Sequence, residues 1–218
     1  KSLVDKLALG ILSMLDLSTG DFVHVLNFPE LTVKEKFRIV YYEGEAALAL
    51  LKAYELTRKS RYLQAVEVIF DRFINNQYWK YSDHWLAYAT AHLIRYRPKR
   101  EYLEFGLLNV KDKLDFVLER QTTFPTLLEL MVASKKILDV VFLESENVDL
   151  VNDFDVEKFY RAINYRANYL RNGFFWPEWA MFFPKPQKLK GAFFIRHHAF
   201  RVRIDDVEHY LSGLIGYQ

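Results

Sequence analysis

The fold is decided by the stretch EGEAALALLKAYELT, which runs from Glu43 to Thr57. Wound as an α-helix, it is apolar around almost its whole circumference, which is typical of a helix buried on every side. The next segment, 60–74, carries apolar residues on one stripe and charged residues on the other face. This pattern indicates a helix that lies outside and contacts the core with one face only. The two segments therefore predict an inner helix followed by an outer helix.

The same alternation recurs along the chain. Inner helices are expected to begin near positions 43, 85 and 124, a spacing of about 40 residues that is typical of a helical-hairpin array. A fourth begins near 205, after a long insertion. We therefore predict an all-α fold, a single α/α domain over 1–218 that forms an α/α hairpin array or partial α/α toroid of about eight helices. Their expected ranges are 2–15, 43–57, 60–74, 85–94, 99–119, 125–140, 156–172 and 205–215.

Two long connections, 16–42 and 173–203, each precede an inner helix. They should therefore lie on one face of the array, the face where structured loops usually carry function. The second connection is aromatic and contains an expected short β-hairpin near 192–204. The candidate site is accordingly sought where the inner helices begin.

The composition excludes several classes of protein. Basic residues (30) nearly balance acidic residues (28), so nucleic acid is not expected as a partner. The absence of Cys excludes disulfides and thiolate metal sites, and together with the absence of a signal peptide it favours a cytoplasmic location. No apolar run reaches the roughly 20 residues that span a bilayer, so no transmembrane segment is expected.

Two motifs resemble a known superfamily. The stretch YYEGEAALAL at 41–50, followed by YELT at 54–57 and RYL at 61–63, resembles the inner-turn-outer hairpin of α/α toroids in the six-hairpin glycosidase-like superfamily. The stretch DHWLAYA at 83–89 is similar to the start of another inner helix of that group. The resemblance implies an α/α toroid that acts as a glycoside hydrolase, uronyl hydrolase, polysaccharide lyase or sugar epimerase, or that is catalytically silent.

A complete toroid contains more helices than the eight expected here. Three interpretations follow from this difference. The chain is an open array, a fragment of a longer chain, or a domain whose toroid is completed by a partner domain or chain.

Polar and aromatic residues collect at the expected starts of the inner helices. Carboxylates there either cap the helix or take part in chemistry, and glycosidic cleavage needs two of them. Aromatic rings there either pack in the core or stack on sugar rings. The predicted catalytic residues are Asp83, His84, Asp205, Asp206 and His209, and the predicted ligand-binding residues at these helix starts are Tyr41, Tyr42, Glu43, Glu45 and Trp85.

The second long connection adds a local basic patch. Arg201 and Arg203 alternate along an extended segment and should point to the same side, where they can hold a ligand carboxylate or phosphate. Arg203 can equally pair with a nearby carboxylate as a structural clamp. The other predicted ligand-binding residues of this connection are Trp176, Glu178, Arg196 and His198.

A metal site is not predicted. His197, His198, Asp205 and His209 offer possible ligands, but no spacing such as HExxH fixes them. We expect no metal and no cofactor.

Two functions are consistent with these features. The first is a carbohydrate-active protein that acts on an acidic polysaccharide or oligosaccharide, and the second is a noncatalytic helical-array module that binds a glycan or a protein partner. A terpenoid-cyclase-like enzyme is a third interpretation, because Gln77-Tyr78-Trp79 is faintly similar to the Gln-Trp repeats of that class. The expected partner is a glycan or a small acidic ligand.

Overall fold

The computed structural model describes residues 2–218 and confirms an all-α fold with a short β-hairpin. Each of the eight expected helices is present, with ends that differ by a few residues, apart from the fifth, which is divided in two. The helices are α1 (Ser2–Ser13), α2 (Val40–Thr57), α3 (Ser60–Asn75), α4 (His84–Leu93), α5 (Arg100–Lys111), α6 (Leu114–Glu119), α7 (Thr126–Leu143), α8 (Val156–Leu170) and α11 (Ile204–Tyr217).

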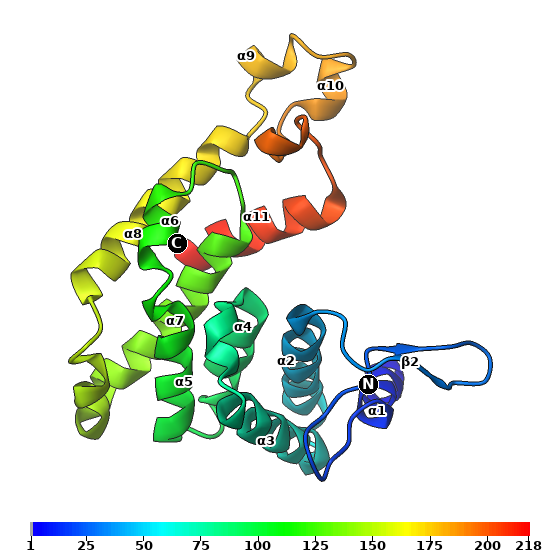
Figure 1. Cartoon of the computed structure of the whole chain (residues 1–218). Helices are drawn as coiled ribbons and strands as arrows, with labels where there is room; N and C mark the ends of the chain where they lie inside the picture. The colour runs from blue at the N-terminus through cyan, green and yellow to red at the C-terminus, as the bar shows by residue number, and fades with distance from the viewer. Residues whose placement is uncertain (1) are drawn as a thin grey trace.

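The inner helices form a row in chain order. Helix α1 packs on α2, α2 on α4, α4 on α7, and α7 on α11 (Figure 1). The outer helices α3, α5 and α8 cover α2, α4 and α7, respectively. The inner and outer pattern predicted from the sequence is therefore confirmed.

Burial differs between the middle and the edge of the row. Helix α4 lies between α2 and α7, and nearly all its residues are buried or half-buried. Helix α2, predicted to be buried on every side, leaves Ala49 and Leu56 exposed. This prediction was wrong because α1 covers only part of that face. A groove of about 350 Å³ remains there, lined by Ile11 of α1, by Met14 directly after it, and by Ala46 and Ala49 of α2.

The segment predicted as one outer helix over 99–119 is two helices. Helix α5 ends at Lys111 and α6 begins at Leu114, after a turn at Asp112 and Lys113. The turn redirects α6 toward α8, against which it packs, whereas α5 packs against α4 and α7. As a result, α6 stands beside the beginnings of α4 and α7 rather than continuing the outer layer.

The long connections contain short elements. In 16–39, β1 (Val25–Leu26) and β2 (Val33–Glu35) pair antiparallel, although the sequence predicted no strands there. In 192–204, the expected hairpin is reduced to one antiparallel bridge, Ile195 to Arg201, around a single helical turn. The remaining short helical turns are η1 (Tyr78–Tyr81), η2 (Ser145–Val151), η3 (Arg171–Gly173), α9 (Pro177–Ala180), α10 (Pro186–Leu189) and η4 (Arg196–His198).

Within residues 2–218, every helix is too short or too polar to cross a bilayer. The segment with α9 and α10 projects from the end of the molecule farthest from α1 (Figure 1).

His92 should make the stability of the fold depend on pH. Burial, together with the charges of Lys52 and Arg95, lowers the pKa of this α4 side chain to about 4, and the charges of Glu55 and Lys136 also act on it. The unfolded chain therefore binds a proton at His92 between about pH 6.5 and 4 while the folded chain does not, so folding weakens as pH falls through this window. A difference of this size corresponds to about 3 kcal/mol near pH 4, and solvent screening of this partly exposed side chain reduces the expected penalty to about 2 kcal/mol.

His92→Gln removes this titration. Urea unfolding at pH 7 and pH 4.5 should show that the variant loses about 2 kcal/mol less stability than the wild type over this interval. An equal loss in both proteins would show that His92 is not responsible.

Candidate functional site

Three titratable side chains meet where α4, α7 and α11 begin. His84 is the first residue of α4, Glu129 lies in the first turn of α7, and His209 lies in the second turn of α11. Nδ1 of His209 is 2.7 Å from Oε2 of Glu129, and Nε2 of His84 is 4.0 Å from the same oxygen. We call these three residues the His–Glu–His cluster. Glu129 and His84 are buried and His209 is partly exposed, so the cluster is closed on the protein side and accessible from α11.

The ring of His84 has one free nitrogen. Its Nε2 is buried and makes no hydrogen bond, whereas its Nδ1 lies 3.3 Å from Oδ2 of Asp83. A carboxylate beside Nδ1 favours the tautomer with its proton on that nitrogen. Nε2 then presents a lone pair toward Glu129 and His209.

Asp83 has two roles in the structure. Its Oδ1 accepts a hydrogen bond of 3.0 Å from the backbone N–H of Leu86, so it caps α4 as the capping interpretation predicted. Its Oδ2 is buried without a hydrogen bond and faces His84. Capping and orientation of the imidazole therefore come from the same carboxylate.

Asn109 of α5 fixes the start of α4. Its Oδ1 accepts a hydrogen bond of 3.1 Å from the backbone N–H of Asp83, and its Nδ2 donates one of 2.8 Å to the Asp83 carbonyl. Both polar ends of this buried amide thus bind the backbone of one residue, Asp83. Sequence reasoning missed Asn109, because its role depends on how two helices pack.

Glu129, on α7, is held by groups from two other helices. The hydroxyl of Tyr88, on α4, lies 3.3 Å from its Oε1 and 2.9 Å from Oγ of Ser212, on α11. Burial, followed by the charge of Glu129, raises the pKa of Tyr88. Burial lowers the pKa of His209, but its hydrogen bond to Glu129 and the charge of that carboxylate outweigh burial, so the net shift is upward. The negative charge of Glu129 and the protonated form of His209 therefore stabilise each other.

Two aromatic rings border the cluster, as predicted. The Tyr41 ring lies 5.8 Å from that of His84, and the Trp85 ring lies 5.8 Å from that of His209. Burial raises the pKa of the neighbouring Glu45, on which the charges of His84, Asp83 and His209 also act. The structure thus brings together these predicted residues with Asp83, His84 and His209.

Glu43 and Tyr42 belong to a different cluster. Glu43 is buried, with Oε1 3.2 Å from Nε2 of His24 and Oε2 2.9 Å from Nη1 of Arg72. Nδ1 of His24 accepts a hydrogen bond from the backbone N–H of Arg38, so the ring proton is on Nε2, which donates a hydrogen bond to Glu43. The ring of Tyr42 lies 5.4 Å from that of His24. Since both oxygens of Glu43 are engaged, this cluster attaches the first long connection to α2 and α3.

Of the basic patch predicted from Lys188, Lys190, Arg196, Arg201 and Arg203, the two arginines nearest the start of α11 are neutralised. Arg203 pairs with Asp205 and Asp206, and Arg201 lies 3.5 Å from Asp206. The structural clamp is therefore the arrangement observed for Arg203. Asp205 and Asp206 are committed to these arginines rather than to the His–Glu–His cluster.

The other predicted residues of the second long connection lie apart from the cluster. Trp176 packs its ring on Phe174, and Glu178 lies in α9, on the projecting segment (Figure 1). The backbone N–H of Arg196 donates to Oγ1 of Thr123, and His198 ends η4. Neither α9 nor η4 reaches the beginning of α4.

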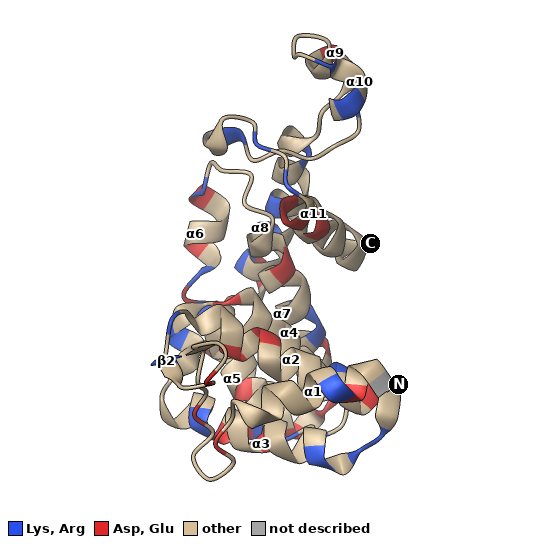
Figure 2. Ribbon diagram, turned by 90° about the vertical axis from the view of Figure 1, so that its right-hand side faces the viewer, with Lys and Arg blue, Asp and Glu red and all other residues tan. Residues whose placement is uncertain are grey.

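A pocket of about 240 Å³ opens beside Asp83 and His84, and we call it the α6 pocket. Lys113 and Arg120 directly precede and follow α6, at whose two ends Figure 2 shows basic residues, and both line the pocket. Nζ of Lys113 lies 4.2 Å from the centre of the Phe116 ring, and the Arg120 guanidinium lies 5.3 Å from it. The remaining lining residues are Tyr41, Tyr81, Ser82, Asp83, His84, Phe124, Thr126, Leu127 and Leu130.

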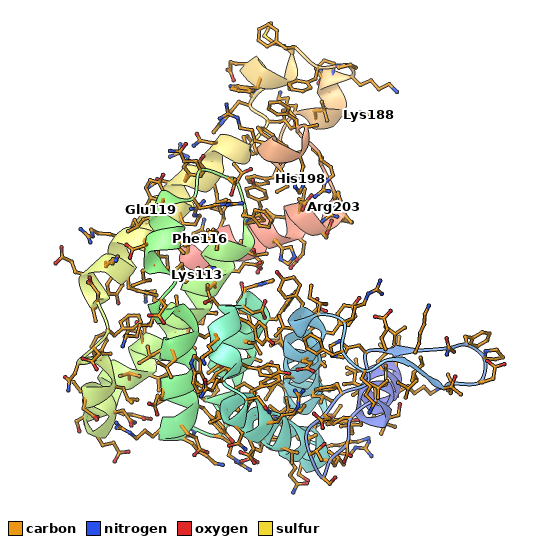
Figure 3. The ribbon with its side chains drawn as sticks, in the orientation of Figure 1. Lys113, Phe116, Glu119, Lys188, His198 and Arg203 are labelled. Carbon is orange, nitrogen blue, oxygen red and sulfur yellow. The ribbon has the colours of Figure 1, made fainter. Side chains whose placement is uncertain are left out.

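The α6 pocket holds two cations without a carboxylate partner. Among residues 2–218, Lys113 and Arg120 form no ion pair with a carboxylate. Phe116 lies on α6 and Lys113 directly before it, and both are well separated from His198 and Arg203 (Figure 3). Lys113 was missed because 99–119 was predicted as one outer helix, and Arg120 because it lies just beyond that range.

Glu129 was also missed, although the sequence contained a signal for it. An inner helix was expected to begin near 124, and Glu129 is the carboxylate of its first turn. The rule that selected Asp83 and Glu43 at their helix starts also selects Glu129.

No family model, no curated protein and no solved structure matches this chain. The function is therefore inferred from the site alone.

Proposed function

We propose that this protein is a carbohydrate-active enzyme that binds an acidic saccharide in the α6 pocket and acts on it at His84. The observation that carries the proposal is the composition of the pocket. Asp83 and His84 lie on one side, and Lys113 and Arg120 on another. A uronate has a carboxylate that such cations can hold through charge-assisted hydrogen bonds.

The aromatic lining suits a sugar. Tyr41, Tyr81, Phe116 and Phe124 offer rings against which the apolar face of a pyranose can pack. The resemblance of YYEGEAALAL and DHWLAYA to α/α toroids adds a reason to choose a saccharide among acidic ligands. The catalytic groups expected at the reacting bond are His84, Glu129 and His209, since histidine and glutamate serve as general acids and bases near neutral pH.

Binding is tested by titrating a panel of uronate and neutral oligosaccharides into the protein and measuring the heat released. We expect an acidic oligosaccharide to bind, and Lys113→Ala and Arg120→Ala each to weaken it about tenfold or more, because each removes a hydrogen bond to a charged group. Lys188→Ala is the matched control, since this lysine lies in α10, away from α6 (Figure 3), and should leave the affinity unchanged. Equal binding by all variants would contradict the proposed pocket.

Turnover distinguishes an enzyme from a noncatalytic module. His84→Asn should lower the rate of saccharide conversion by a factor of about 100 or more while the acidic saccharide still binds. Binding without conversion in the wild type would favour the noncatalytic glycan-binding module.

A further inference from the structure

We propose that the His–Glu–His cluster is a binding site for one divalent transition-metal ion, of which Zn²⁺ is the probe used below. This departs from the expectation of no metal, and it deepens the proposed function: with an ion bound, His84, Glu129 and His209 would be its ligands instead of general acids and bases, and the ion would supply Lewis acidity or an activated water for the reaction. Only the catalytic use of the metal rests on the proposed function, because metal binding is measured without a saccharide.

The donor atoms are close enough to share an ion. One ligand atom from each of His84, Glu129 and His209 lies within 4.8 Å of the other two. In tetrahedral geometry, zinc bonds of about 2.0–2.2 Å hold two ligand atoms roughly 3.3–3.6 Å apart. The longest separation in the site therefore needs to contract by about 1.5 Å or less, a movement available to side-chain torsions.

The second, independent observation is the unpartnered nitrogen of His84. Its side chain is more than nine-tenths buried, and Nε2 has no hydrogen-bond partner. A lone pair on this nitrogen, aimed at a carboxylate 4.0 Å away, is electrostatically unfavourable unless a cation lies between them. A metal ion removes this mismatch by accepting both donors.

The surrounding groups are those that usually support metal ligands. Histidine ligands typically direct their other ring nitrogen to a carboxylate, which fixes the tautomer, and Asp83 lies 3.3 Å from Nδ1 of His84. The hydroxyl of Tyr88 holds the second oxygen of Glu129. The ligand set thus has an outer layer of the kind that orients a metal site.

The donor set selects the class of metal. Two imidazoles and one carboxylate suit Zn²⁺, Fe²⁺ and related ions, whereas Mg²⁺ and Ca²⁺ prefer oxygen ligands only. Three protein ligands leave at least one position open, as in catalytic rather than structural zinc sites. Because His84 also lines the α6 pocket, an open position can face a bound ligand.

Metal binding is tested on the full chain after removal of metals with a chelator. Titration with Zn²⁺ at pH 7 should give one equivalent bound, and Co²⁺ in place of Zn²⁺ should give visible absorption bands of a nitrogen- and oxygen-ligated ion. His84→Asn and His209→Asn should each weaken Zn²⁺ binding at least a hundredfold, and Asp83→Asn about ten- to a hundredfold.

His92→Gln is the matched control, since His92 lies on the same helix as His84 but outside the cluster and should keep wild-type affinity. Far-UV circular dichroism confirms folding of each variant, and His84→Asn removes no hydrogen bond of Nε2. Absence of stoichiometric binding by the wild type, or wild-type affinity in both folded histidine-to-asparagine variants, would overturn the metal site.

The two proposals fail separately. Lys113→Ala combined with Arg120→Ala should abolish saccharide binding and leave Zn²⁺ affinity unchanged. Loss of Zn²⁺ binding in this double variant would contradict the assignment of the metal to the His–Glu–His cluster.

Discussion

Arg166→Met should lower the free energy of unfolding by about 3 to 5 kcal/mol, because three backbone carbonyls lose their hydrogen-bond donor. Arg166 lies on α8 and is fully buried. Its guanidinium donates to the carbonyls of Val117, Arg120 and Thr122, which end α6 and begin the following loop. Methionine has a similar volume but no donor, so three carbonyls lose their partner, and each unsatisfied group costs about 1 to 3 kcal/mol.

Burial lowers the pKa of Arg166, and no carboxylate compensates its charge. Its contribution therefore comes from the hydrogen bonds to carbonyls. Urea unfolding at pH 7 measures the effect. Arg166→Lys should lose less stability than Arg166→Met because an ammonium can still donate to these oxygens.

Arg161→Met is the matched control on the same helix, since Arg161 is exposed and should change stability by less than about 0.5 kcal/mol. Equal stability of the Arg161 and Arg166 variants would show that the carbonyl network does not hold α6 in place.

The functional consequence follows from position. The loop fixed by Arg166 carries Arg120 and leads to Phe124, and both line the α6 pocket. Arg166 on α8 thus holds in place the loop whose residues shape the α6 pocket.

The regular helices were predictable because the residues within each segment form a hydrophobic pattern that is typical of a helix. Hydrophobic periodicity over 60–74 predicted α3, which spans Ser60–Asn75, and the apolar run after Asp83 predicted α4. The turn that separates α5 from α6 has no such cause in the sequence. No Gly or Pro stands at Asp112 and Lys113, so the periodic pattern continued through the break.

The candidate site was predictable only in part, for a related reason. His84, Asp83 and His209 were found because they stand at the starts of inner helices, and the row of helices confirmed that these starts lie together. Glu43 satisfies the same rule yet faces His24 and Arg72. The position of a residue along a helix can be predicted from the sequence. The neighbours that its side chain meets in the assembled row of helices depend on tertiary packing.

Gly44→Ala should lower the free energy of unfolding by about 2 kcal/mol, although alanine is the better helix former by about 1 kcal/mol. A Cβ at Gly44 would lie 2.8 Å from Cβ of Trp85 and 3.0 Å from the backbone nitrogen of Leu86. Backbone atoms of α4 cannot rotate away, so α2 and α4 must separate. The overpacking penalty, about 1 to 3 kcal/mol for extra core methyl groups and higher against backbone, therefore exceeds the helix-propensity gain.

Gly10→Ala is the opposing control, because Gly10 lies within α1 and a methyl group added there would meet no atom within 4 Å. This variant should be more stable than the wild type by about 0.5 to 1 kcal/mol. Chemical unfolding of both variants distinguishes the effect of close contact between α2 and α4 on stability from the effect of helix propensity.

Since Trp85 follows His84 directly, separation of α2 from α4 should also displace the His–Glu–His cluster. Gly44→Ala, unlike Gly10→Ala, should therefore bind Zn²⁺ more weakly. A Gly44→Ala protein as stable as Gly10→Ala would mean that the contact between α2 and α4 is loose enough to accept a methyl group.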